Sequence, residues 1–371
     1  MKKFTFALTF LLFTAGSLFS EPVIKGNVVI GSTILENNEE NIQFGGAYAL
    51  ADISGGNEYV TSAGKIYYRL NATNDAEKLG QKVELKKVYV KVNPLGNKLL
   101  EIAGGKLYSY YLAGNFFQLA EIYTGSSRWG KTGLGIKSEF LGITLGLGLP
   151  LTESYAAFSQ GWGINAAGQF DFKEYFNEIP VKIGADLLFS REKQKDQSYK
   201  NDYSSSISVN YGPKLCGFLS KLNVTATFSF NSEPYVANSS FKNVSNYSNS
   251  DLKKANFASL NFKSNFGPIE FILEGEAGYS LSADMIPLYS GLQFGIPVTK
   301  NFDFKPRFFY YGALDKLDSE KSRQTFEIYP RIWLNFGKWN FMAGYDFDFK
   351  QSTKDNWNFE WSLPVLVEYK F

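Results

Sequence analysis

The expected fold is decided by the stretch Trp361-Ser362-Leu363-Pro364-Val365-Leu366-Val367-Glu368-Tyr369-Lys370-Phe371. Its odd positions are all apolar, whereas its even positions are polar or proline except for Leu366. Successive side chains of a β-strand point to opposite faces, so this stretch predicts a strand with one apolar face and one mostly polar face. Such a strand suits a sheet whose two sides meet different surroundings.

The same alternation recurs about eighteen times along the chain, in segments of nine to thirteen residues such as 222–230 and 339–350. Tilted strands of this length can cross a bilayer, with apolar side chains towards lipid and polar side chains towards a lumen. A water-soluble sandwich would show the same alternation with the polar face outside, so the alternation alone permits both folds. The interpretation favoured here is an all-β fold, a transmembrane antiparallel up-and-down β-barrel of about 16–18 strands.

The connections between these segments separate the two folds, because they alternate between short and long. Short turns are expected at residues 94–97, 141–142, 266–268, 298–301 and 336–338. Long polar loops are expected at residues 73–82, 108–131, 152–161, 191–201, 231–256, 312–325 and 351–358. An outer-membrane barrel has short periplasmic turns and long extracellular loops, whereas a sandwich has no reason for this asymmetry. We therefore expect both ends of the mature chain to be periplasmic.

The first twenty residues have the pattern of a secretory signal peptide. Lys2 and Lys3 form a basic beginning, an apolar stretch follows over residues 4–19, and Ser17 and Ser20 offer cleavage points. We expect export through the Sec pathway, with residues 1–20 removed and residues 21–371 forming a single barrel domain. An uncleaved N-terminal anchor is the alternative.

The composition restricts the classes of partner. Aromatic residues make up 17% of the chain, which suits the aromatic girdles of a barrel. The formal net charge of +2 is too small to argue for a nucleic-acid partner. The mature chain contains no run of eighteen apolar residues, so no membrane-spanning helix is expected in it. The single cysteine, Cys216, excludes an intramolecular disulfide framework.

The chain contains no histidine, which argues against an enzyme. Without histidine there is neither a Ser-His-Asp triad nor an HExxH zinc site, and we expect no metal and no cofactor. Glu270, Glu274 and Glu276 share one strand face and could in principle hydrolyse glycosides, but charges that line a wet lumen explain them more simply. Residues 125–132 match a phosphate-binding loop, yet a Gly-rich strand follows them where that motif requires a helix.

The end of the chain resembles the closing strand of bacterial outer-membrane barrels, whose C-terminal assembly signal is matched by Val367, Tyr369 and Phe371. Over residues 23–371 the chain is similar to the general diffusion porins. The resemblance implies recognition by the barrel-assembly machinery and an outer-membrane location in a Gram-negative-type envelope. It also implies that the long loop at residues 108–131 folds into the barrel as a constriction. This loop is apolar for a surface loop, and within its residues 112–121 Glu121 is the acidic one.

These observations predict a porin, a passive water-filled channel for small hydrophilic solutes that is embedded in outer-membrane lipid. Whether the porin is a monomer or a homotrimer stays open. A surface adhesin or structural barrel that binds partners through its extracellular loops is the main alternative. A transporter for hydrophobic substrates, with an N-terminal plug, is a further one.

A group of basic residues is expected to line the pore. Within residues 59–71, an outward phase for Val60 and Ile66 turns Lys65 and Arg69 inward. In the next segment, outward Val88 turns Lys87 and Lys91 into the same lumen. A lysine or arginine facing lipid at mid-membrane would cost about 2–4 kcal/mol, which favours this phase. With Lys137, these cations would stand opposite Glu121 and bias a constriction towards anions.

Overall fold

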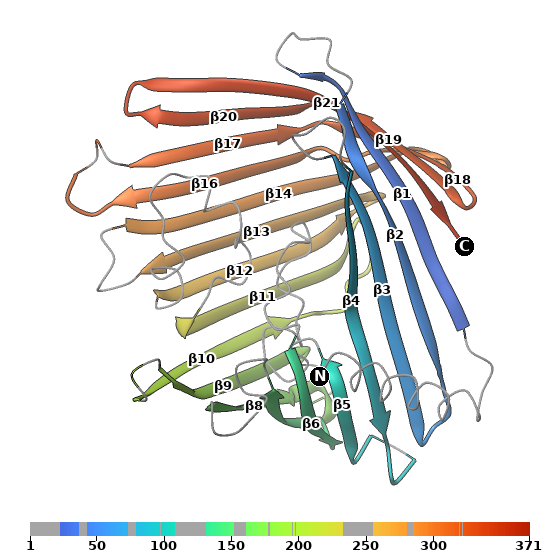
Figure 1. Ribbon diagram of the computed structural model, residues 1–371, viewed down its shortest axis with the longest axis vertical. Helices are drawn as coiled ribbons and strands as arrows, with labels where there is room; N and C mark the ends of the chain where they lie inside the picture. Colours follow the sequence, from blue (N-terminus) through green and yellow to red (C-terminus); the bar gives the residue numbers. More distant parts are fainter. Residues whose placement is uncertain are drawn as a thin grey trace.

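In this computed structural model the first strand pairs with the last as well as with the second, and this pairing closes the sheet into a barrel (Figure 1). The structure describes residues 23–36, 43–72, 79–96, 98–107, 131–151, 161–176, 179–194, 196, 198–232, 255–279, 285–318, 320 and 322–371. The predicted signal peptide, Glu121 and the loop at 108–130 lie outside the described residues.

The strand segments, in chain order, are β1 (Val23–Glu36), β2 (Gln43–Gly56), β3 (Val60–Ala72), β4 (Leu79–Val92), β5 (Glu101–Leu107), β6 (Lys131–Phe140), β7 (Ile143–Leu151), β8 (Gly161–Asp171), β9 (Val181–Lys193), β10 (Tyr199–Tyr211), β11 (Leu219–Ser232), β12 (Ala255–Phe266), β13 (Ile269–Tyr279), β14 (Met285–Thr299), β15 (Phe302–Phe304), β16 (Arg307–Asp315), β17 (Arg323–Tyr329), β18 (Arg331–Phe336), β19 (Trp339–Gly344), β20 (Asp346–Thr353) and β21 (Asn356–Lys370). A short 3₁₀ turn, η2 (Phe172–Glu174), follows β8. Within the described residues there is no helix long and apolar enough to cross a membrane.

The 21 segments make 18 barrel strands, because three strands are each interrupted once. β15 and β16 are separated at Lys305-Pro306, β17 and β18 at Pro330, and β19 and β20 at Tyr345. Proline has no amide hydrogen and therefore cannot donate to the hydrogen-bonded ladder inside a closed sheet. The count of 18 lies at the upper end of the predicted range, so the predicted fold class is confirmed.

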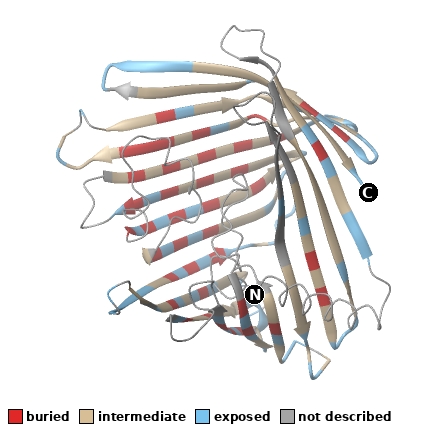
Figure 2. Ribbon diagram, in the orientation of Figure 1, coloured by how far each residue is buried: buried red, intermediate tan, exposed pale blue. Residues whose placement is uncertain are grey.

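Buried and more exposed residues alternate along many strands of the wall (Figure 2), and the polar side chains of β11 are the buried ones, in contrast to a soluble protein. On β11, Thr225, Thr227 and Ser229 are buried on the inner face. Phe228 and Phe230 alternate with them and are 44% and 41% exposed on the outer face. An apolar outer surface of this kind is stable against lipid and unstable against water, which fits the inward phase predicted for the polar positions.

The strand ends confirm most of the predicted alternation of connections. Short turns such as Leu141-Gly142, Gly267-Pro268 and Gly337-Lys338 lie at one end of the barrel. At the other end, β11 and β12 are joined by residues 233–254, and β5 and β6 by residues 108–130. The predicted long loop at 351–358 was wrong. β20 and β21 continue to a two-residue turn, Lys354-Asp355, because the alternation extends further than the polar residues suggested.

Candidate pore lining

The inward phase of the basic group depends on a bulge between β3 and β4. Lys65 is paired with Lys87, whereas the next residue, Ile66, is paired with Leu85, so that Lys86 is an extra residue in β4. The apolar residues of β4 change phase at this point, from odd positions before Lys86 to even positions after it. A bulge absorbs such a change and keeps the apolar side chains of both halves on the outer face.

Three of the predicted cations lie on the inner face with their side chains beside carboxylates. Lys65 Nζ is 3.3 Å from a carboxylate oxygen of Asp52 on β2. Lys91 Nζ is 3.2 Å from a carboxylate oxygen of Glu101 on β5. These contacts match the antiparallel register, in which Asp52 is directly opposite Lys65 and Lys91 is next to the position of Glu101.

Lys137 and the remaining predicted residues extend this part of the wall. Lys137 is directly opposite Glu101 in the register and 3.7 Å from Glu139 on its own strand. The register pairs Lys87 with Lys65 and Arg69 with Tyr48. Lys65, Lys91 and Lys137 thus lie on one wall over β3, β4 and β6, and their role in the pore stays a prediction. The sequence did not predict that carboxylates on neighbouring strands would pair with them.

A second wall, on β12–β14, carries buried carboxylates in a hydrogen-bonded network. Glu274 accepts hydrogen bonds from the Asn261 side-chain amide at 3.2 Å and from the Tyr289 hydroxyl at 3.3 Å. Glu276 accepts one from the Ser259 hydroxyl at 2.9 Å. β4 and β13 are half-way round the 18-strand barrel from one another, so this wall is opposite the basic one. The expected common face of the β13 glutamates is confirmed by their register.

The acidic wall continues onto β17–β21, where the sequence analysis did not predict ion pairs. Arg331 donates to both carboxylate oxygens of Asp346, at 2.7 and 2.8 Å, and its guanidinium lies 4.8 Å from the Tyr329 ring centroid. Lys350 lies 2.5 Å from Glu360 and 3.6 Å from Asp348. Register is the signal that could have revealed the pairs Arg331–Asp346 and Lys350–Glu360, because the partners of each are in different strand segments.

The arrangement can bind water and ions. Cations of the inner wall stand beside carboxylates in the contacts described above, so their fields partly cancel within a few ångströms. Among the described residues no cluster of histidine, cysteine and carboxylate side chains could hold a metal ion. The chemistry of this surface is therefore that of a polar, nearly balanced lining.

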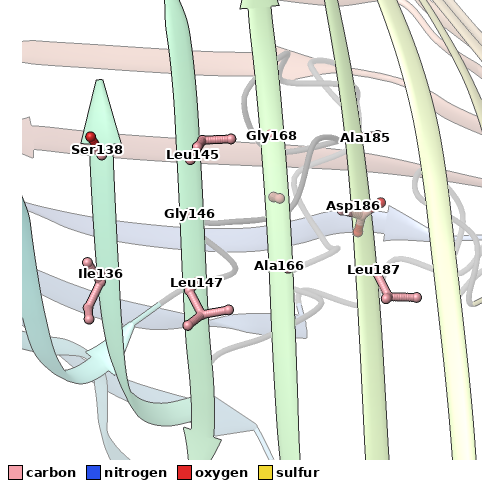
Figure 3. Close-up of a pocket in the computed structure, with 11 residues that line it drawn as sticks. Ile136, Ser138, Leu145, Gly146, Leu147, Ala166, Gly168, Ala185, Asp186 and Leu187 are labelled. Atoms are coloured by element: carbon pink, nitrogen blue, oxygen red, sulfur yellow. The ribbon is translucent and has the colours of Figure 1, made fainter. Parts of the chain in front are cut away.

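A separate groove of about 530 Å³ lies on the outer face over β6–β9 (Figure 3). Ala166, Gly168 and Ala185 form its shallow floor, and Leu145 and Leu187 are among the aliphatic side chains that border it. Small residues on β8 and β9 leave this depression between larger neighbours. Because the groove faces away from the lumen, it is not part of the pore lining.

Solved structures resemble this chain in fold at low sequence identity. OpdK, an outer membrane protein from Pseudomonas aeruginosa, gives a TM-score of 0.55 at 11% identity, covering 94% of this chain and 99% of that chain. OccAB1 from Acinetobacter baumannii gives 0.55 at 11% identity, covering 95% and 96%. The chain has the fold of a porin-like outer-membrane barrel. No protein family model matches the sequence, and no curated protein matches it. The porin-like barrel is thus identified by strand number, closure and the distribution of polar and apolar faces.

Proposed function

We propose that this protein is a porin, a passive water-filled channel for small hydrophilic solutes in an outer membrane. The observation that carries the proposal is the inversion of the two faces in a closed 18-strand barrel, with ion pairs such as Arg331–Asp346 on the inner face and exposed apolar side chains on the outer face. Barrels of this size are too wide for their own strand side chains to fill the lumen. A polar lumen of that width conducts ions and small solutes.

The loop at residues 108–131 is proposed to enter the lumen and narrow it, with Glu121 near the constriction. Its ends support this position, since it leaves β5 at Leu107 and returns at Lys131. The inner face beside those ends carries little side-chain volume, because Gly133, Gly135 and Ala103 are the buried inward residues. A chain segment can therefore approach this wall without displacing large side chains.

The proposed orientation has the short turns in the periplasm and the long loops outside the cell. In this proposal, residues 1–20 direct export through the Sec pathway and are then cleaved off. The barrel-assembly machinery recognises Val367, Tyr369 and Phe371 and inserts the chain into the membrane. Cys216 offers a test, because it is exposed in the connection between β10 and β11 at the short-turn end. A maleimide coupled to a polymer too large for the proposed channel should label Cys216 only after the outer membrane is permeabilised. Labelling of Cys216 in intact cells would show that the short turns lie outside the cell and would refute the proposed orientation.

Conductance of the refolded full-length mature chain in planar bilayers tests the proposal directly. We expect stepwise, ohmic channels whose conductance rises with salt concentration. Liposome swelling should show that small neutral sugars pass faster than larger ones. A correctly folded barrel that conducts neither ions nor sugars would refute the channel and favour the adhesin or structural barrel instead.

A further inference from the structure

The short-turn end of the barrel carries an excess of exposed lysines. Its eight turns follow β2, β4, β6, β8, β10, β12, β14 and β18, and five of them contain an exposed lysine. A sixth exposed lysine lies in the irregular start of β11, between Ser220 and Asn223. The six residues, called here the lysine rim, are Lys98, Lys173, Lys214, Lys221, Lys300 and Lys338. The described residues of the same turns include two exposed carboxylates, Glu58 and Glu174.

The long-loop end has no such excess in the part of it that the structure describes. Its exposed charges there are of both signs: Arg191, Lys200 and Lys354 with Asp196, Asp202, Glu320 and Asp355. The net charge of the chain is close to zero, so composition alone does not reveal this difference. The basic character therefore belongs to one end of the barrel.

Neighbouring carboxylates neutralise little of the lysine rim. Lys98 Nζ lies 3.4 Å from a carboxylate oxygen of Glu139, and 80% of the Lys98 side chain is exposed. Among the described residues, this is the one ion pair that a lysine of the rim makes. The rim therefore presents a net positive charge to its surroundings.

Exposed aromatic side chains lie at the same height as the lysine rim. Trp339 follows Lys338 directly, is 47% exposed, and has its ring centroid 4.7 Å from that of Tyr369. Tyr175 lies two residues after Lys173 and is also 47% exposed. On the outer face of a barrel, such rings gather where the hydrocarbon meets the lipid headgroups. A lysine beside them can keep its methylene groups on apolar surface while its ammonium group reaches the headgroup layer.

We propose that the lysine rim binds the headgroups of anionic phospholipids in the leaflet that the short turns reach. The proposal rests on the proposed function in one respect, that the barrel lies in a bilayer, and the proposed orientation makes this leaflet the periplasmic one. The rim lysines are spread over five turns around the circumference, from the β4–β5 turn to the β18–β19 turn. A planar layer that surrounds the barrel can meet all of them, whereas a single docked protein would meet only some. Each lysine near an anionic membrane surface strengthens the attraction roughly fivefold.

Electron spin resonance of spin-labelled lipids tests the proposal in vesicles that contain the refolded mature chain. The measured quantity is the association of phosphatidylglycerol with the barrel relative to that of phosphatidylcholine. We expect a preference of about two- to fivefold at low salt, because part of the lipid around the barrel lies at the other end. The preference should fall towards one at 1 M salt, where the Debye length is about 3 Å. Equal association of the two lipids, or a preference that persists at 1 M salt, would overturn the proposal.

Two matched variants test which end of the barrel is responsible. The rim variant carries the changes Lys214→Gln, Lys300→Gln and Lys338→Gln. The control removes as many exposed cations from the long-loop end, by Arg191→Gln, Lys200→Gln and Lys354→Gln. The rim variant should lose at least half of the preference for phosphatidylglycerol, and the control should keep it. A smaller loss in the rim variant, or an equal loss in both, would overturn the proposal.

Two further measurements separate the lysine rim from the channel and from another anionic surface. An absence of channels in neutral bilayers that contain the wild type would refute the proposed function, while the lipid preference of the same protein would stand. Co-sedimentation with purified peptidoglycan tests the cell wall as the partner. If the rim variant loses binding to peptidoglycan and keeps its preference for phosphatidylglycerol, the rim binds the cell wall and the proposal is overturned.

Discussion

Removing the carboxylates that face the basic wall should make the channel prefer anions. The change is Asp52→Asn together with Glu101→Gln, which leaves Lys65 and Lys91 in place and removes the negative charges at 3.3 and 3.2 Å from them. A unit charge about 8 Å from a permeating ion, close to the Debye length at physiological salt, shifts that ion's energy by roughly 0.2 kcal/mol after screening. Losing both charges therefore lowers the energy of an anion by ~0.4 kcal/mol and raises that of a cation by ~0.4 kcal/mol. The difference of ~0.8 kcal/mol raises the anion-to-cation permeability ratio roughly fourfold.

The zero-current potential of single channels in a KCl gradient measures this ratio. The opposite pair of changes, Lys65→Gln with Lys91→Gln, should move the potential towards cation preference, and adding changes at Arg69 and Lys87 should increase the shift. Both effects should shrink at 1 M salt, where the Debye length falls to about 3 Å.

The matched control is Glu320→Gln at the long-loop end of the barrel. Glu320 lies 2.5 Å from Lys354, and both side chains are more than half exposed. The hydrogen bond from Lys354 to Glu320 raises the pKa of Lys354. In the Glu320→Gln protein this contribution is lost, but an ordinary lysine pKa of about 10.4 still keeps Lys354 charged at pH 7. The control should leave the potential unchanged. A low-salt potential that is also unchanged in the Asp52→Asn/Glu101→Gln protein would place the basic wall away from the narrowest part of the pore and refute the reasoning.

The barrel seam and the opposite wall give two further predictions. Deleting Phe371 should lower the yield of assembled barrels more than the thermal stability of barrels already formed. Gly26→Val should lower the stability by about 1–3 kcal/mol, because a Cβ at Gly26 would clash with the carbonyl oxygen of Leu50 and lie 2.6 Å from the Phe371 ring. Heat-modified gel mobility reports both effects, and equal losses on deletion would mean that Phe371 has a structural role alone. A double-mutant cycle of Arg331→Gln and Asp346→Asn should give a coupling energy of about 1–3 kcal/mol, because the ion pair is bidentate and mostly buried. Urea unfolding from lipid vesicles measures this energy, and a coupling near zero would contradict the prediction.

Alternation in the sequence was sufficient for the fold class, the faces and most turns. Period-two patterns depend on local side-chain chemistry, so the inward phase of Lys65 and Lys91 could be predicted within a single segment. The bulge at Lys86 was also encoded locally, as the change of apolar phase between Leu85 and Val88. These features are predictable because a bilayer imposes the same requirement on every strand.

The ion pairs of the lining could not be predicted in the same way. Asp52 meets Lys65, and Arg331 meets Asp346, only because neighbouring strands take a particular register. A shift of a strand by two residues would keep every face and change every pair, and the alternation pattern cannot detect such a shift. The anion bias of the basic group stays a prediction, and the carboxylates beside Lys65 and Lys91 reduce the bias that these cations alone would give.

The interruptions at Pro306, Pro330 and Tyr345 are neighbours in space as well as breaks in sequence. The register from Arg307–Tyr329 to Phe304–Ile332 brings the first two breaks side by side, and the amide of Tyr345 donates to the carbonyl of Pro330 at 3.2 Å. A barrel with uninterrupted strands is stiff, because every strand is hydrogen-bonded along its length to both of its neighbours. Here three of the 18 strands are interrupted at one height, which makes a line along which the barrel wall can bend. Bending along this line would relieve lateral pressure from a thinning or curving bilayer. The hydrogen-bonded pairing between β1 and β21, which closes the barrel, would stay intact.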